Sequence, residues 1–214
     1  NKIFLIDYPV FHDSYVNNSE AEESLDLKLK VPILLALGGT RTDKGLDVLL
    51  VSLALVHEPF HLVVAGKEEH FSLDFIEQKV STYSSSVTLR LAFLSDDEFG
   101  QYVDTSDCIV LPYRKSFDGA SGPMTEAIWR RKPVIGPNHG SIGYLIKKYG
   151  LGYTFEAENV ADLANTITKY LRNPDGFRWS EQAETYRERL DPDIFAKRYI
   201  ELYERLLSTK RVSE

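Results

Sequence analysis

Residues 108–137 read CIVLPYRKSFDGASGPMTEAIWRRKPVIGP, a stretch whose pattern predicts a strand, a loop, a short helix and a second strand. Cys108–Leu111 is a continuous apolar run of strand length. Ser121 offers a capping hydroxyl and Pro123 a proline for the first turn, so a helix is expected to begin here. Pro133 disfavours helix at the residue before it, and a second apolar run follows. This succession of elements is typical of α/β folds.

The predicted helix would begin just beyond the carboxyl end of the preceding strand. Its unpaired N–H groups and its dipole favour an anion, most often a phosphate. Gly119 and Gly122 would let that anion come close to the main chain. Many α/β proteins use the same arrangement only for tight packing, so the loop alone does not decide the matter. Asp118 and Glu126 flank the loop with seven residues between them, and two acids suit hydroxyl groups such as those of sugars.

Composition narrows the class of protein. The 214 residues suffice for one sizeable domain or a domain with an appendage, and 43% hydrophobic with 27% charged residues is ordinary for a globular protein. A formal charge of −7 argues against a general nucleic-acid binder. The single cysteine, Cys108, excludes an internal disulfide and is expected to be inert core. No apolar run reaches the ~18 residues of a membrane span and no signal peptide is visible, so we expect a cytoplasmic protein.

Strands and helices alternate along the rest of the chain. Further strands are expected at Ile33–Leu37, Phe60–Ala65, Val87–Phe93 and Gly152–Phe155, with a strand-like run within residues 1–12. Helices are expected at Leu46–His57, Phe71–Val80, from a capping box at Ser95 onward, and at Ile142–Lys148, Ala161–Leu171, Trp179–Arg189 and Ile194–Leu207, with a weaker pattern at Glu20–Leu29. Near-continuous apolar strands predict an α/β fold with a doubly wound parallel sheet. Ligands of such folds bind beyond the carboxyl ends of the strands, where the loops after residues 37, 65, 93 and 112 would lie.

A second candidate anion site is the loop GGTRTDKG at residues 38–45, which places Arg41 and Lys44 just before a helix. Cations at a helix N-terminus are unfavourable unless a negative group offsets them. Two interpretations are open. Asp43 offsets the cations in one, and in the other a diphosphate is held by the Arg41 fork and the Lys44 point charge.

Other polar residues give weaker signals. Tyr113 and Arg114 would reach the ligand edge, although Arg114 is equally compatible with a solvated loop charge. His139 could face a ligand or solvent. Trp129 fits core packing better than base stacking, and helix capping explains the acidic residues that follow Ser95 better than a metal does. No nucleophile–base constellation stands out.

Taken together, these residues resemble the retaining GT-B glycosyltransferases of the "group 1" type, in their C-terminal, Rossmann-like, nucleotide-sugar-binding domain. The family's first signature, a Gly, an Arg and a Lys-Gly before a helix, is similar to residues 38–45. Its second, two glutamates separated by seven residues, is similar to the pair Asp118 and Glu126. Residues 106–113 and 132–135 look like the strands on either side of it.

The resemblance implies roles for particular residues. Arg41 and Lys44 would hold the donor diphosphate and stabilise its charge as it leaves, so neither a metal nor another cofactor is expected. Glu126 would bind the ribose hydroxyls, while Asp118 and the amides of residues 119–122 would contact the transferred sugar. The main chain at Phe93 and Leu94 would border the base. The expected donor-binding residues are Gly39, Phe93, Leu94, Tyr113, Gly119, Ala120, Ser121, Gly122 and Glu126, beside the catalytic set Arg41, Lys44 and Asp118.

The chain departs from the family pattern at two positions. Asp118 stands where the family has a longer glutamate, which shortens the reach toward the sugar. Gly143 stands where the family often has an acidic residue after two glycines, so the local contact there is in doubt.

The resemblance covers half of a two-domain enzyme. Residues 1–30 would lead in from a missing N-terminal domain, residues 31–175 would form the nucleotide-sugar-binding domain, and residues 176–214 would be helices packed on it. The expected function is the donor-binding half of a glycosyltransferase of polysaccharide or glycoconjugate synthesis, acting on a saccharide or lipid-linked acceptor, with retention and inactive alone. Its partners would be a nucleotide sugar and the N-terminal domain or a partner chain, with peripheral membrane association through that half left open. The alternative is a non-catalytic nucleotide-sugar-binding or regulatory subunit.

Overall fold

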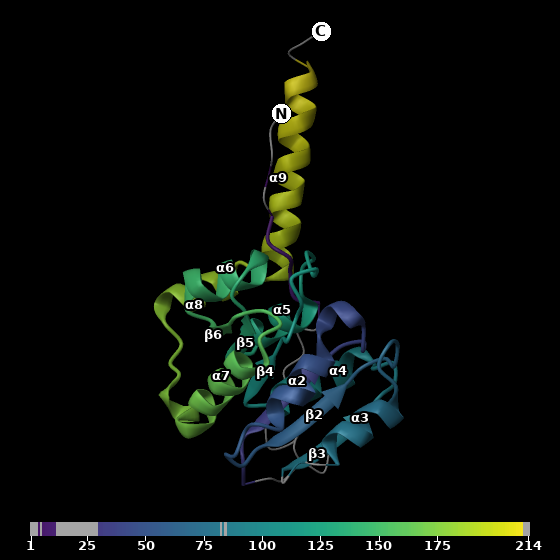
Figure 1. Ribbon diagram of the computed structural model, residues 1–214. Helices are drawn as coiled ribbons and strands as arrows, with labels where there is room; N and C mark the ends of the chain where they lie inside the picture. The colour runs from purple at the N-terminus through teal and green to yellow at the C-terminus, as the bar shows by residue number, and fades with distance from the viewer. Residues whose placement is uncertain (1–3, 5, 12–29, 82, 84, 212–214) are drawn as a thin grey trace.

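The computed structural model describes residues 4, 6–11, 30–81, 83 and 85–211 of the chain. Within this part, six strands form one parallel sheet in the order β3-β2-β1-β4-β5-β6. Helices cover both faces of the sheet (Figure 1). The predicted doubly wound α/β fold is therefore confirmed, and it is Rossmann-like.

The elements alternate along the chain as the sequence predicts. The strands are β1 (Ile33–Leu37), β2 (His61–Ala65), β3 (Ser86–Arg90), β4 (Cys108–Val110), β5 (Val134–Pro137) and β6 (Gly152–Phe155). The helices are α2 (Leu46–Leu53), α3 (Leu73–Val80), α4 (Asp96–Thr105), α5 (Gly122–Trp129), α6 (Gly140–Tyr149), α7 (Val160–Arg172), α8 (Glu181–Glu188) and α9 (Pro192–Arg211). In the described part of the chain, two 3₁₀ turns join these elements, η1 (Thr42–Lys44) and η2 (Pro174–Gly176).

Strand β1 explains why the sheet needs helices on both sides. All five of its residues are buried, and successive side chains point to opposite faces. Leu35 packs in the core beneath α4, α5, α6 and α8, whereas Leu34 packs beneath α2, α3 and α7. Because neither face meets water, the strand has the uninterrupted apolar sequence seen in buried parallel sheets. The lone cysteine, Cys108 of β4, is fully buried in the second of these cores.

The strand order reverses between β1 and β4. β1 pairs with β2 on one side and with β4 on the other, so the loops after β1 and β4 diverge to opposite faces of the sheet. Such a switch point leaves a crevice at the carboxyl edge, where open α/β sheets bind their ligands. The sheet thus brings the loop at 38–45 beside the loop that follows residue 111.

Several predicted boundaries were wrong. The helix after β1 ends at Leu53 and not at His57, because the N–H groups of Leu55 and Val56 bond three residues back and close turns. β3 ends at Arg90, three residues before the predicted Phe93, since it is a half-exposed edge strand. Most other ends shift by one or two residues, whereas α9 extends to Arg211. The helical pattern at Glu20–Leu29 lies outside the described residues.

The described N-terminal segment, residues 6–11, forms no strand, although the sequence predicted a strand-like run there. It is nevertheless part of the core: Val10 is 1% exposed, and its N–H donates to the Leu190 carbonyl at 2.9 Å. The segment runs beside α9, which projects from the layered body (Figure 1). Within the described residues, no helix combines the length and apolar character that crossing a bilayer requires.

Candidate functional site at the strand switch point

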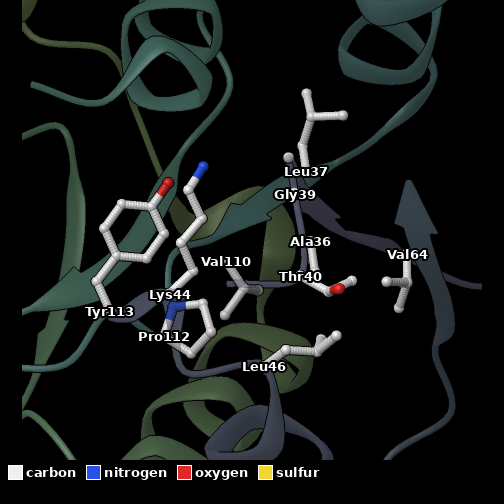
Figure 2. A pocket seen from close by; sticks show the side chains of 11 residues that line it. Ala36, Leu37, Gly39, Thr40, Lys44, Leu46, Val64, Val110, Pro112 and Tyr113 are labelled. Carbon is white, nitrogen blue, oxygen red and sulfur yellow. The ribbon is translucent and has the colours of Figure 1, made fainter. Parts of the chain in front are cut away.

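A pocket opens at the carboxyl ends of β1 and β4, where the strand order reverses (Figure 2). We call it the switch-point pocket. Its lining residues come from the ends of β1, β2 and β4 and the loops that follow β1 and β4: Ala36, Leu37, Gly38, Gly39, Thr40, Lys44, Leu46, Val64, Val110, Pro112 and Tyr113. Of the predicted site residues, the fold thus brings Gly39, Lys44 and Tyr113 together here.

Gly38 and Thr40 give the loop after β1 its shape. Gly38 has φ +117°, which disfavours any residue with a Cβ, and an added Cβ would lie 2.6 Å from Lys44 Nζ. The buried Thr40 hydroxyl donates to the Phe71 carbonyl at 2.9 Å and accepts from the Glu69 N–H at 2.8 Å. These bonds anchor the loop to the chain between β2 and α3. Its bare main chain is therefore held in one conformation.

Lys44 is the cation that reaches the pocket. Its ammonium lies 5.4 Å from the centre of the Tyr113 ring, and Figure 2 shows the two side chains side by side. Among the described residues, no carboxylate lies within ion-pairing distance of Lys44. A cation over an aromatic face gains a modest attraction, and its N–H donors remain available to an anion.

Arg41 has a different environment. Its guanidinium pairs with Asp43, and its side chain is 52% exposed. Hydrogen bonding from Arg41 lowers the pKa of Asp43, and the same pair raises the pKa of Arg41. Arg41 does not line the switch-point pocket. The offset by Asp43 that the sequence left open is present, and the role of Arg41 toward a diphosphate stays a prediction.

The second predicted anion-binding element, the N-terminus of α5, adjoins this pocket. The Ser121 side chain accepts the Met124 N–H at 3.3 Å, which confirms the predicted cap, and Pro123 stands in the first turn. The Tyr113 hydroxyl lies 3.1 Å from Ser121 Oγ, so the ring beneath Lys44 is bonded to the cap of α5. A Cβ on Gly38 would also lie 3.9 Å from Pro123 Cγ. The lysine loop and the α5 terminus therefore converge on one place.

A larger cavity, of about 460 Å³, is bordered by the loop before α5. It is lined by residues 6–8, residues 118–121, the inner sides of α5 and α6, and Tyr186. Asp118, Gly119 and Ala120 are exposed there. The structure thus gathers four predicted residues in this cavity, namely Asp118, Gly119, Ala120 and Ser121.

Glu126 lies apart from both spaces. It is 2% exposed, and its carboxylate forms an ion pair with Arg130, which also contacts Asp104 at 3.1 Å. Its other oxygen accepts the main-chain N–H of Phe11 at 3.2 Å. This buried cluster joins α4, α5 and the N-terminal segment. The predicted contact of Glu126 with ribose stays a prediction.

The residues predicted to border the base lie farther along the sheet edge. Phe93 is 84% exposed, whereas Leu94 packs in the core at 9% exposure. They follow β3, which β2 separates from the switch point, and neither lines the switch-point pocket or the cavity beside Asp118. Gly122 likewise lines neither, although it is the first residue of α5.

Two residues that the sequence left ambiguous are buried or bonded. Arg114 is 24% exposed and forms ion pairs with Asp47 and Glu158, so it is not a solvated loop charge. His139 is the N-cap residue of α6 and lines a small pocket together with Tyr113; both of its ring nitrogens are buried, and no described residue bonds to them. No local signal in the sequence reports the partners of Arg114, because Asp47 and Glu158 lie in distant elements.

Gly143 and Trp129 are also accounted for. A Cβ on Gly143 would lie 2.4 Å from the Asn138 carbonyl carbon, so this turn of α6 packs directly on main chain. Trp129 packs against the core with Arg187 over its ring at 4.9 Å, as expected of a packing residue. Among the described residues, no group of three or more His, Cys, Asp or Glu is arranged to hold a metal ion.

A six-stranded parallel sheet with helices on both faces and a glycine- and lysine-bearing loop at its switch point defines a Rossmann-like α/β domain. Residues 17–189 match the family described as "Glycosyl transferases group 1". The chain therefore belongs to the group 1 glycosyltransferases.

Individual relatives agree with this assignment. Over 201 residues the chain is 26% identical to a glycogen synthase of Alkaliphilus metalliredigens, covering 89% of this chain and 42% of the relative. The sucrose-phosphate synthase of Thermosynechococcus elongatus superposes with a TM-score of 0.74 at 20% identity, over 94% of this chain and 50% of that one. The isolated C-terminal domain of a group 1 protein of Francisella tularensis superposes with a TM-score of 0.62 at 19% identity, over 86% of this chain and 93% of that domain.

The chain thus spans about half the length of the full-length relatives it matches. Anabaena HepE, solved in complex with UDP and glucose, superposes with a TM-score of 0.72 at 17% identity, over 87% of this chain and 52% of that chain. These likenesses are those expected of a C-terminal GT-B domain.

Proposed function

We propose that this chain is the donor-binding half of a glycosyltransferase, which holds a nucleoside diphosphate sugar at the switch-point pocket. The observation that supports it best is the position of the Lys44 ammonium, over Tyr113 and beside the capped N-terminus of α5. A lysine and a helix N-terminus that converge on a bare glycine loop suit a diphosphate. The complex of the related HepE with UDP and glucose supports the same class of ligand.

Lys44 would act on the charge that develops during transfer. As the bond between the anomeric carbon and the diphosphate oxygen breaks, negative charge collects on the leaving diphosphate. A fixed ammonium and the N–H groups of α5 stabilise that charge without a metal. Asp118, exposed in the neighbouring cavity, would contact the transferred sugar. Acceptor binding and the retention of anomeric configuration would need the other half, so the chain alone would transfer no sugar, because closure of two domains excludes water.

The proposal is tested by calorimetric titration of the chain with UDP, GDP and ADP in buffer free of divalent metal. We expect one nucleotide to bind, and Lys44→Ala to weaken it about tenfold or more, because a hydrogen-bonded charge is lost. The matched control is Lys67→Ala, which removes an exposed lysine at the same sheet edge that does not line the pocket. A folded chain that binds none of the three, or binds one equally well without Lys44, contradicts the proposal.

A further inference from the structure

Arg114 makes four polar contacts within and beside the loop that carries Lys44. Its Nε donates to the Thr42 carbonyl at 3.0 Å, and its main-chain N–H donates to the Asp43 carbonyl at 2.9 Å. Its two terminal nitrogens reach Asp47 Oδ2 at 2.5 Å and Glu158 Oε1 at 3.1 Å. One planar guanidinium therefore ties η1, the first turn of α2 and the loop before α7 together.

These contacts bracket Lys44 in the sequence. Thr42 and Asp43 are the residues of η1 that precede it, and Asp47 follows it in α2. The turn also has no room to move toward β4, since a Cβ on Gly45 would lie 2.1 Å from the Pro112 carbonyl oxygen. The main-chain position of Lys44 is thus set from both sides. A lysine carries its charge on a flexible four-carbon stem, so its backbone position decides what the charge can reach.

We call the contacts of Arg114 with the lysine loop, Asp47 and Glu158 the clamp. Glu158 forms its far end and has an unusual backbone conformation. It has φ +66°, in the left-handed region that residues with a Cβ adopt at a cost. Such strain persists where the surroundings fix the residue. In this conformation the Glu158 carboxylate accepts a hydrogen bond from Arg114, which lies 44 residues earlier in the chain.

We propose that Arg114, braced by Glu158, is a positioning residue that sets the Lys44 ammonium for the diphosphate of the donor; this rests on the proposed function. Arg114 does not itself line the switch-point pocket and acts through Lys44. A displacement of about 1 Å can cause a large loss in an interaction that depends on where a charged group is placed.

The test uses inorganic pyrophosphate and the best-bound nucleotide as probes, with the variants Arg114→Ala, Arg114→Lys, Lys44→Ala and the double variant Arg114→Ala/Lys44→Ala. We expect Arg114→Ala to weaken both probes by the same factor, about fivefold to tenfold. Arg114→Lys should stay weakened, because an ammonium cannot span three acceptors at once. In the Lys44→Ala background, the loss of Arg114 should add nothing. A purely structural role would weaken both backgrounds equally, and that result would overturn the inference.

A second, independent test of the proposal uses Glu158. Glu158→Gly removes the carboxylate and also the strained Cβ, so we expect weaker pyrophosphate binding with unfolding midpoints equal to wild type or higher. Arg90→Ala, which breaks an exposed ion pair with Glu98 away from the loop, serves as the control. If Lys44→Ala weakens binding but the Arg114 and Glu158 variants do not, the clamp is wrong and the proposed function stands. If wild type binds no probe, the proposed function fails and this inference with it.

Discussion

Two separate constraints favour glycine at position 38: its backbone conformation, and the lack of space for a Cβ. Its φ of +117° excludes most residues, and the added carbon would lie 2.6 Å from the Lys44 ammonium nitrogen. A single methyl group there would therefore strain the main chain and push the lysine away. The residue that lets the loop turn is also the residue that leaves space for the cation.

We predict that Gly38→Ala lowers the free energy of unfolding by roughly 1–3 kcal/mol, because the left-handed backbone becomes strained. Urea unfolding followed by circular dichroism measures this. The matched control is Gly122→Ala, where an added Cβ meets no atom within 4 Å and φ is not in the strained region. The control should be neutral or stabilising by up to about 1 kcal/mol. Equal losses in the two variants would contradict the explanation.

At the scale of elements, sequence patterns predicted the features that depend on neighbouring residues, namely the helices, the strands and their order. The capping box at Ser95, the cap at Ser121, the proline stops and the apolar runs depend on neighbours in sequence, so the order of strands and helices followed from the sequence. The environment of Glu126 did not, because it depends on Arg130, on Asp104 of α4 and on the Phe11 N–H. Likewise, the approach of Lys44 to α5 depends on the register of β1 beside β4.

β2 and β3 are joined by a buried histidine as well as by their ladder. His61 Nδ1 lies 2.6 Å from Ser86 Oγ and its Nε2 lies 2.9 Å from Thr88 Oγ1, both on the neighbouring strand. The residue is 4% exposed, and burial lowers the pKa of its imidazole. The neutral ring is therefore the form that this strand pair stabilises.

We predict that His61 makes stability fall in mild acid. Above the ordinary histidine pKa of about 6.5 the ring is neutral in both states, so it contributes no pH dependence. As the pH falls below that value, the unfolded chain binds a proton that the folded chain resists. The free energy of unfolding then decreases by at most about 1.4 kcal/mol per pH unit, until the lowered folded pKa is reached. Urea unfolding from about pH 7.5 to 5.5 should give a shallower slope for His61→Gln than for wild type; identical slopes would exclude this role.

At the scale of the molecule, the N-terminal segment holds distant parts of the chain together. Asp7 pairs with Arg189 at 2.7 Å and with Arg198 at 3.1 Å, which links the segment to the chain after α8 and to α9. Desolvation and the bond to Asp7 act in opposite directions on Arg189, and the net result is a raised pKa. The Asp7 side chain is 9% exposed, whereas those of Arg189 and Arg198 are 34% and 36% exposed, so solvent screens these pairs in part.

We predict that Asp7→Asn destabilises the chain by about 0.5–2 kcal/mol, because two partly exposed arginines lose the charge of their shared acceptor. Thermal unfolding by calorimetry measures the loss. Asp175→Asn, a charge change at an exposed turn, is the control and should lie within about 0.5 kcal/mol of wild type. A neutral outcome for Asp7→Asn would mean that the ion pairs of Asp7 contribute little to the stability of the fold.

The complete burial of the only thiol makes Cys108 a reporter of how often the sheet opens. Cys108 lies in β4 at the centre of the sheet, and burial raises the pKa of its thiol. The thiol therefore stays protonated in the folded protein, and the reactive thiolate does not form. A thiol reagent can therefore modify the protein only when the central sheet opens, so the labelling rate reports the frequency of that opening. Because β4 also ends at the switch-point pocket, a bound nucleotide would slow the modification of Cys108 as its occupancy rises. The thiol would therefore report nucleotide binding without an added label.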